Sequence, residues 1–424
     1  MRKIKRTYIL VIQAVIFSLI ITVYLSAINP LSRFPQSTDF FKFYSSAKLF
    51  WSGENIYKLI PLATPLTVLI ESATNSHKIT NLHPNLNSPF HTLCISLFGL
   101  LDFHTAFMLW SIFSLCCGLA AIALFYKKII NSDVNLIYLL NIWIIILLYF
   151  PTWINFRLGQ FALVLLFLIA IAWKTSKDGN DVSAGIILGL ATALKLYFGI
   201  FIILFILYRR WRLIFCLFGT FLICNILSVV VFTLPTYKNF LSLLQNMPWY
   251  AGSWNASFMD FFTRMFGGSL NTPLANLPWL ARTLSLVLSL ALLGWIIRLA
   301  QPFSHRLTSD RFDLVFSLAL VAMLLISPYG WLYYFPILIF PMMVAWRTVE
   351  KYHLGNIYKI IIGFSWALTT IPTSLIWAED VRMNQPVIWF TSAGIYFYAL
   401  LIITGIFIGL LHNINKSLLP KNAG

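Results

Sequence analysis

The stretch YILVIQAVIFSLIITVYLSAIN, from Tyr8 to Asn29, decides the fold class, because it is apolar and long enough to cross a bilayer. The basic cluster from Arg2 to Arg6 precedes it, and such clusters usually stay in the cytoplasm. No small-residue cleavage pattern follows, so we expect a retained anchor rather than a removed signal peptide. The N-terminus should therefore be cytoplasmic, and the chain after Asn29 should emerge on the other side.

The composition extends this prediction to the whole chain. Hydrophobic residues make up 59% of the 424 residues and charged residues only 10%, which is typical of a multi-pass membrane protein. The formal net charge is +17, but most Lys and Arg lie between apolar runs. That distribution favours membrane topology and lipid headgroups over nucleic-acid binding.

Further apolar segments follow the first one, and with it they make about twelve full or partial spans. We therefore expect an all-α polytopic membrane protein that forms a single domain over residues 1–424. The further segments are Ser88–Leu101, Thr105–Tyr126, Val134–Phe150, Phe161–Trp173, Ser183–Tyr208, Trp211–Leu234, Leu280–Leu299, Phe312–Ser327, Trp331–Trp346, Ile357–Trp377 and Val387–Leu411.

Two long polar loops interrupt the apolar segments, at residues 30–87 and 235–278. Both mix aromatic and polar residues, which predicts short helices on the membrane surface, for example over Asp39–Trp51. Basic clusters in the C-terminal half indicate which segments are cytoplasmic, and they place both long loops on the outer side. The C-terminus is then cytoplasmic.

The middle of the chain allows two topologies. If every apolar run crosses once, Lys127 and Lys174 fall outside, against the positive-inside bias. In the alternative, Ser88–Leu101 is re-entrant and Ser183–Tyr208 consists of two half-helices broken at Lys195. The basic clusters then turn inward, and Arg157, Gln160 and Lys195 face the outer side. We favour this second arrangement.

Asp39 is the leading candidate for a functional residue. Only 13 of the 424 residues are Asp or Glu, and this one opens the first outer loop close to the membrane. An acid in that place on a membrane-embedded chain suggests a functional site. The alternative is an N-cap, in which Asp39 or Thr38 simply starts the surface helix. Lys195 is also conspicuous, because it lies in the middle of an apolar run.

No metal site is expected. His77, His91 and His104 lack ligand spacing, and the five cysteines all lie inside apolar runs, where small buried side chains are the ordinary interpretation.

A series of short motifs follows this membrane frame along the chain. They are Asp39-Phe-x-x-Phe-Tyr-x-x-Ala47, Trp51-x-Gly53-x-Asn55-x-Tyr57, His83-Pro84 with Ser88-Pro89-Phe90, Ala106-x-x-x-Trp110, Gly159-Gln160, Ala184-Gly185-x-x-x-Gly189, Lys195, Asn255-x-Ser257 and Ser327-Pro328-x-x-Trp331. Each motif is weak alone, but together and in this order they resemble glycosyltransferase family 87, the membrane mannosyltransferases that use a polyprenyl-phosphate sugar. One departure is Tyr333-Tyr334, which stands where the family often has His.

The resemblance implies a GT-C-type architecture and the transfer of a hexose, with mannose expected, to a lipid-linked or glycan acceptor. It implies that the site faces outward from a plasma membrane, which we expect to be bacterial, and that no cofactor is needed. The expected roles fall on these residues: Asp39 as the base; Lys195, Arg157 and Arg264 for the donor phosphate; Gln160, Asn255, His83, Tyr44, Trp331 and Tyr333 for the sugar or acceptor.

Two other classes remain alternatives. An O-antigen-type polymerase or ligase would also have many helices and large outer loops, but the Arg-x10-Gly spacing common in polymerases is missing from this sequence. A secondary transporter often shows internal repeats and paired midplane charges, and the sequence shows no repeat.

Overall fold

The computed structural model describes residues 2–57, 85–130, 135–246, 252, 254–267, 274–300, 310–376 and 394–418. Apart from one isolated β-bridge between Asn255 and Trp331, the regular structure in this part of the chain is helical. Six of its helices are long and apolar enough to cross a membrane, or seven if one bent pair counts as a span. The protein is therefore a helical membrane protein.

The helices run along the chain in the following order, with short 3₁₀ turns labelled η. They are α1 (Arg2–Arg33), η1 (Pro35–Ser37), α2 (Phe40–Trp51), α4 (Pro89–Ile95), η2 (Ser96–Leu100), α5 (Phe103–Ile130), α6 (Leu136–Leu147), α7 (Phe150–Leu158), α8 (Ala162–Lys177), α9 (Asp181–Leu194), η3 (Leu196–Gly199), α10 (Ile200–Leu207), α11 (Trp211–Phe232), α12 (Leu234–Asn246), α13 (Phe258–Phe266), α14 (Pro278–Ala300), α15 (Asp310–Ile326), η5 (Leu332–Leu338), α16 (Ile339–Lys351), α17 (Asn356–Thr370), η6 (Thr373–Leu375) and α19 (Ile395–Leu418).

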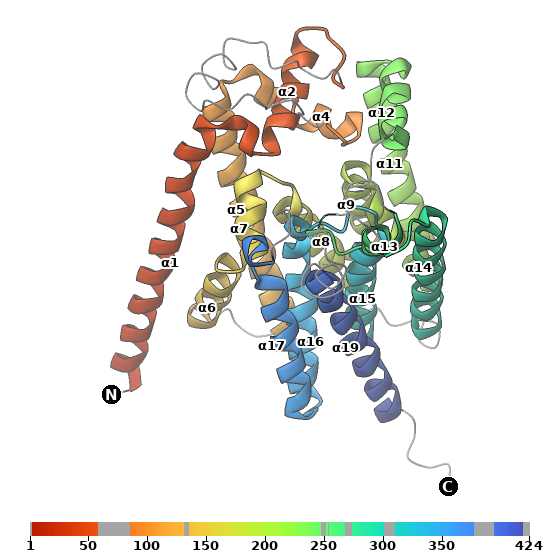
Figure 1. Ribbon diagram of the computed structural model, residues 1–424. Helices are drawn as coiled ribbons and strands as arrows, with labels where there is room; N and C mark the ends of the chain where they lie inside the picture. The colour runs from red at the N-terminus through yellow and green to blue at the C-terminus, as the bar shows by residue number, and fades with distance from the viewer. Residues whose placement is uncertain are drawn as a thin grey trace.

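Every apolar run of the sequence contains helix, and the predicted surface helix is present as α2. The sequence did not predict α7, which is bent by 65° against α6. Figure 1 shows α2, α4 and α12 together at one end of the molecule, and both termini at the other end. We call these the α2 end and the terminal end.

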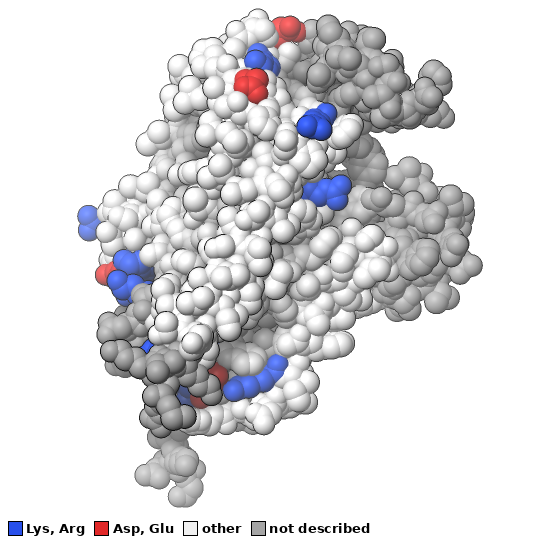
Figure 2. Space-filling view, turned by 90° about the vertical axis from the view of Figure 1, so that its left-hand side faces the viewer, with Lys and Arg blue, Asp and Glu red and all other residues white. Residues whose placement is uncertain are grey.

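The side of the molecule that carries α1 is suited to lipid. Its outward residues are large and apolar, including Tyr8, Ile12, Val15 and Leu19. Figure 2 shows a broad central area of this side without charged residues. An apolar area of this size would promote aggregation in water, but it is the normal surface of a protein in contact with lipid acyl chains.

The apolar run at residues 183–208 is broken at Lys195, as the second topology predicted. α9 ends at Leu194, Lys195 has an extended backbone, and η3 with α10 continues the chain. The far ends of the two arms meet, because Arg210 Nε donates to Asp181 Oδ1 at 2.6 Å. The two arms therefore form a hairpin that carries Lys195 at its tip.

Small residues allow this hairpin to pack closely on α11. A Cβ at Gly185 would lie 2.4 Å from the Leu213 carbonyl oxygen, and one at Gly189 would lie 2.5 Å from that of Leu217. The Gly-x-x-x-Gly spacing is thus a helix-packing motif, as is common between membrane helices.

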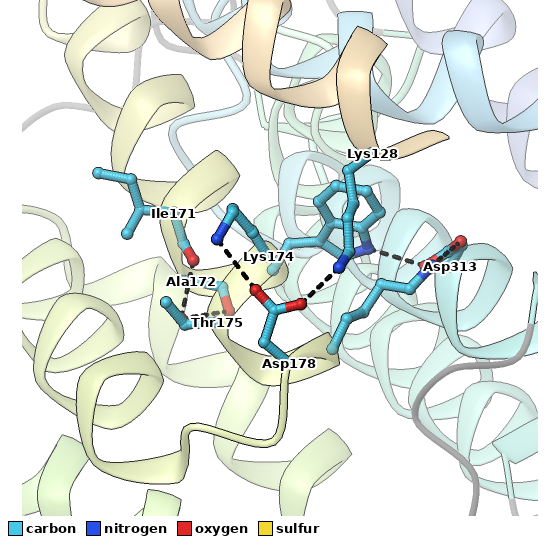
Figure 3. Close-up of polar contacts among 9 residues, drawn as sticks. Lys128, Ile171, Ala172, Lys174, Thr175, Asp178 and Asp313 are labelled. Carbon is cyan, nitrogen blue, oxygen red and sulfur yellow. Dashed lines mark hydrogen bonds and ion pairs between the residues drawn. The ribbon is translucent and has the colours of Figure 1, made fainter. Parts of the chain in front are cut away.

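Ion pairs hold the ends of three helices at the face opposite Asp39. Figure 3 shows Asp178 between Lys128 of α5 and Lys174 of α8. A separate ion pair joins Lys177 of α8 to Asp313 of α15. The two lysines keep the pKa of Asp178 below its ordinary value by hydrogen bonding to its carboxylate. Basic clusters of the middle and the C-terminal half therefore share one face.

The segment Pro89–Leu100 stays at the α2 end. Ser88 Oγ, before it, donates to the Ala193 carbonyl at 2.9 Å, and the Leu101 carbonyl, after it, accepts from Tyr44 Oη at 2.9 Å. Both ends of this segment thus make contacts at the α2 end, as expected for a re-entrant segment.

We predict that the α2 end is extracytoplasmic. In a protein whose five native cysteines are replaced, Ser52→Cys should react with a membrane-impermeant thiol reagent in intact cells. Lys127→Cys should react only after permeabilisation, because its basic cluster lies on the opposite face. Both positions are exposed. Labelling of the Lys127 position in sealed cells would contradict this topology.

Candidate functional site

The side chain of Asp39 does not serve as a helix cap. Asp39 occupies the N-cap position of α2, yet within the described part of the chain its carboxylate makes no capping hydrogen bond. Its Oδ1 instead pairs with Lys42 Nζ at 2.6 Å, and its Oδ2 accepts from Gln160 Nε2 at 2.8 Å. The carboxylate thus bridges Lys42 of its own helix and Gln160 in the loop after α7. Lys42, on α2, is the ion-pair partner of Asp39.

A left-handed turn at Gly159 places Gln160 beside Asp39. Gly159 has φ +66°, and a Cβ there would lie 2.6 Å from Phe40 Cβ. Glycine meets both demands, since it tolerates positive φ and has no side chain to clash. The turn is fixed from below by Trp110, whose Nε1 donates to the Gly159 carbonyl at 2.8 Å. The Ala-x-x-x-Trp and Gly-Gln motifs therefore support the same contact.

Asn155 joins this turn to the aromatic segment after α15. Its carbonyl accepts from Gln160 N at 2.9 Å, and its amide Nδ2 donates to the Tyr333 carbonyl at 3.1 Å. Within the described residues, Tyr333 Oη and Gln160 Oε1 are buried and have no hydrogen-bond partner. One of these two atoms thus belongs to the side chain that donates to Asp39.

Lys195 lies near the same group. Its Nζ donates to Asn87 Oδ1 at 2.5 Å and sits 5.2 Å from the centroid of the Tyr334 ring. Burial lowers the pKa of Lys195 to about 7, and the negative charge of Asp39 acts against this lowering. A carboxylate and an ammonium from distant parts of the chain thus share one site, with tyrosine rings beside them.

A buried amide network connects Lys195 to the helix that carries Asp39. Asn85 Oδ1 accepts from Asn87 Nδ2 at 2.8 Å, which orients the amide that meets Lys195. Asn85 Nδ2 in turn donates to Ser46 Oγ of α2 at 3.1 Å and to Thr92 Oγ1 of α4 at 3.2 Å. Fully paired networks of this kind fix geometry. Ser46 is therefore buried and faces the interior of the molecule.

Asn255 has a structural role in the described residues. Its Nδ2 donates to the Pro328 carbonyl at 2.8 Å, and its Oδ1 accepts from Ser257 N at 3.1 Å. The β-bridge to Trp331 reinforces this link. The second long loop is thereby attached to the Ser-Pro-x-x-Trp segment, which leads directly to Tyr333.

Arg264 lies on α13 and is 2% exposed. Its Nη1 donates to the carbonyls of Gly252 and Asn255, at 2.7 and 3.2 Å. Burial lowers the pKa of Arg264 to about 10, so the guanidinium remains charged at neutral pH, while burial raises the pKa of nearby Asp260. Arg264 thus organises the loop, and its Nε and Nη2 have no partner among the described residues.

The remaining residues predicted for the site make no hydrogen bond or ion pair with Asp39 or Lys195 in the described part of the chain. Arg157 is exposed on α7, near the Gly159 turn. The Tyr44 hydroxyl donates a hydrogen bond to the Leu101 carbonyl, and the Tyr44 ring packs on Phe103 with 5.3 Å between the ring centroids. His83 lies outside the described residues. Within the described residues there is no group of three His, Cys, Asp or Glu side chains that could hold a metal.

A comparison with protein-family models gives a match to glycosyltransferase family 87 over residues 85–328, more than half of the chain. The chain belongs to glycosyltransferase family 87. The protein is accordingly a glycosyltransferase, which sets aside the transporter and the polymerase as explanations. A search of curated proteins gives no match.

The glycosyltransferase 87 match contains Asn87, Gln160, Lys195 and Arg264, whereas Asp39 precedes it. The structure brings Asp39 to the matched region through Gln160. Sequence reasoning missed Asn85, Asn87 and Asn155, which position other groups. The available signal was a run of amides beside Ser88-Pro89, directly before an apolar segment.

We predict that Gly159→Ala strongly destabilises the protein, because the substitution adds both backbone strain and a clash with Phe40. The cost should be roughly 2–5 kcal/mol, from a left-handed alanine and an overpacked contact. Gly53→Ala is the matched control, since Gly53 has φ +72° but open space around it. It should cost only about 1–2 kcal/mol. Thermal unfolding in detergent would measure both, and equal losses would contradict the packing argument.

Proposed function

We propose that this protein transfers a hexose from a polyprenyl-phosphate sugar to a hydroxyl of a lipid-linked or glycan acceptor, on the extracytoplasmic face. The resemblance to mannosyltransferases makes mannose the expected sugar. The observation that carries the proposal is the position of Asp39, whose carboxylate is held by Lys42 and Gln160 instead of capping its helix. The amides of Asn87 and Asn85 link Lys195 to the same helix.

Asp39 is proposed to act as the general base. Attack of the acceptor oxygen on C1 of the sugar releases a proton, which a carboxylate within hydrogen-bonding reach accepts. The bond from C1 to the phosphate oxygen breaks at the same time, and its electron pair leaves with the polyprenyl phosphate. Gln160 and Lys42 would hold the carboxylate in place, so that a single orientation meets the acceptor.

Lys195 is proposed to bind the phosphate that departs. An ammonium group stabilises the charge that develops on the phosphate oxygen, and Asn87 holds it by one hydrogen bond while two donors remain. Arg157 and Arg264 would add positive charge nearby. The apolar outer surface of the helices offers the polyprenyl chain a lipid environment, and no metal ion or other cofactor is required by this scheme.

Sugar and acceptor hydroxyls would meet the two unpartnered atoms, Gln160 Oε1 and Tyr333 Oη. Trp331 lies beside Tyr333, with 5.1 Å between the ring centroids, and would present an aromatic face to a sugar ring. Asn255 and Tyr44 would contribute indirectly, by holding the Trp331 segment and the α2–α5 contact.

Asp39→Asn should abolish transfer, because the amide is nearly isosteric with the carboxylate but cannot accept the proton. General-base catalysis contributes roughly a hundredfold to ten-thousandfold, so a loss of that size is expected. The assay supplies membranes with radiolabelled polyprenyl-phosphate mannose and follows label in lipid and glycan fractions.

Asp102→Asn is the matched control, because Asp102 is an acid at the same end that caps Thr105 N at 3.0 Å. This variant should retain nearly full transfer. If Asp39→Asn kept most of its activity with normal expression, Asp39 would not be the base. If label entered products only from a nucleotide sugar, the lipid-linked donor would be wrong.

A further inference from the structure

His91, in α4, is a buried histidine for which the proposed mechanism has no use. It is 0% exposed, and within the described part of the chain neither of its ring nitrogens has a hydrogen-bond partner. Its ring packs between Phe43, at 4.8 Å between centroids, and Phe161, at 4.1 Å. Phe43 lies one turn after Asp39, and Phe161 directly follows Gln160. His91 is therefore enclosed by the two elements that bring Asp39 and Gln160 together.

Hydrogen bonds also hold His91 against the Lys195 hairpin. Ser88 Oγ accepts from the backbone N of His91 at 3.3 Å and donates to the carbonyl of Ala193, two residues before Lys195. The next residue, Thr92, accepts from Asn85, which orients the Asn87 amide on Lys195. Burial lowers the pKa of His91, and the positive charge of Lys195 lowers it further, so the imidazole is neutral. The same contacts that fix Lys195 thus fix the imidazole.

An imidazole in this position costs stability unless something binds it. A buried polar group that lacks a hydrogen bond is unfavourable, and native structures contain few such groups. A phenylalanine would fill the space between Phe43 and Phe161 without that cost. The side chain is therefore better explained by a polar ligand than by packing.

We propose that His91 is a ligand-binding residue of the transferase site, where it contacts the sugar phosphate of the donor beside Lys195. A neutral imidazole carries one N–H donor and one nitrogen acceptor. A sugar phosphate satisfies both, because its phosphate oxygens accept hydrogen bonds and its hydroxyls donate them. This inference rests on the proposed function, since it assigns the donor class to that same site.

The decisive variant is His91→Phe, because it keeps an aromatic ring between Phe43 and Phe161 and removes both nitrogens. Its melting temperature in detergent should equal or exceed that of the wild type. Its KM for a short-chain polyprenyl-phosphate mannose should rise about tenfold to hundredfold, as expected for a lost hydrogen bond to a charged group. His91→Gln, which restores a donor and an acceptor, should recover part of that loss.

Phe161→Leu is the matched control. It disturbs the same aromatic stack but leaves the imidazole in place. It should therefore lower the melting temperature and leave KM nearly unchanged. If His91→Phe were more stable and its KM unchanged, the ring nitrogens would bind no substrate and the inference would be wrong.

A binding measurement keeps the inference testable if a variant folds poorly and separates it from the proposed function. The short-chain polyprenyl-phosphate mannose should raise the melting temperature of the Asp39→Asn protein. The rise should be smaller when Asp39→Asn is combined with His91→Phe. It should be partly restored when Asp39→Asn is combined with His91→Gln. Equal stabilisation of all three would overturn the role of His91 alone. If the wild type neither bound nor transferred from this donor, the proposed function would fall and the inference with it.

Discussion

The hydrogen bond from Gln160 to Asp39 is the interaction on which the candidate site depends. It joins the first outer loop to the start of α8, and it exists because Gly159 turns left-handed directly against Phe40. Trp110 holds that turn from beneath. Without this turn, α2 would be a surface helix with a carboxylate at its end. With it, the carboxylate is fixed at the α2 end of the helical bundle.

The broken helix at Lys195 provides the second half of the site. A lysine within apolar sequence is unfavourable in lipid, and the hairpin of α9 and α10 solves this by bringing Lys195 to the α2 end, where Asn87 receives it. The cost of breaking the helix is offset at the other end, where Asp181 pairs with Arg210. Close packing on α11 through Gly185 and Gly189 keeps the hairpin in place.

Much of this arrangement was predictable from the sequence. Apolar runs located the helices, and the positive-inside bias favoured the break at Lys195, because only that topology gathers the basic clusters on one face. Asp39 stood out through the scarcity of acids. The amide network of Asn85 and Asn87 was not predictable, since its members lie far from Lys195 in the sequence and amides are common in loops. The hydrogen bonds from Gln160 to Asp39 and from Asn255 to the Pro328 carbonyl likewise depend on tertiary contacts that local patterns do not encode.

The most direct test of the account is a structure of the Asp39→Asn protein in lipid nanodiscs with bound polyprenyl-phosphate mannose. The account predicts that the donor phosphate lies within hydrogen-bonding distance of Lys195 Nζ, with C1 of the sugar facing position 39. A donor bound at the terminal end, or a phosphate held away from Lys195 with the sugar remote from position 39, would contradict it.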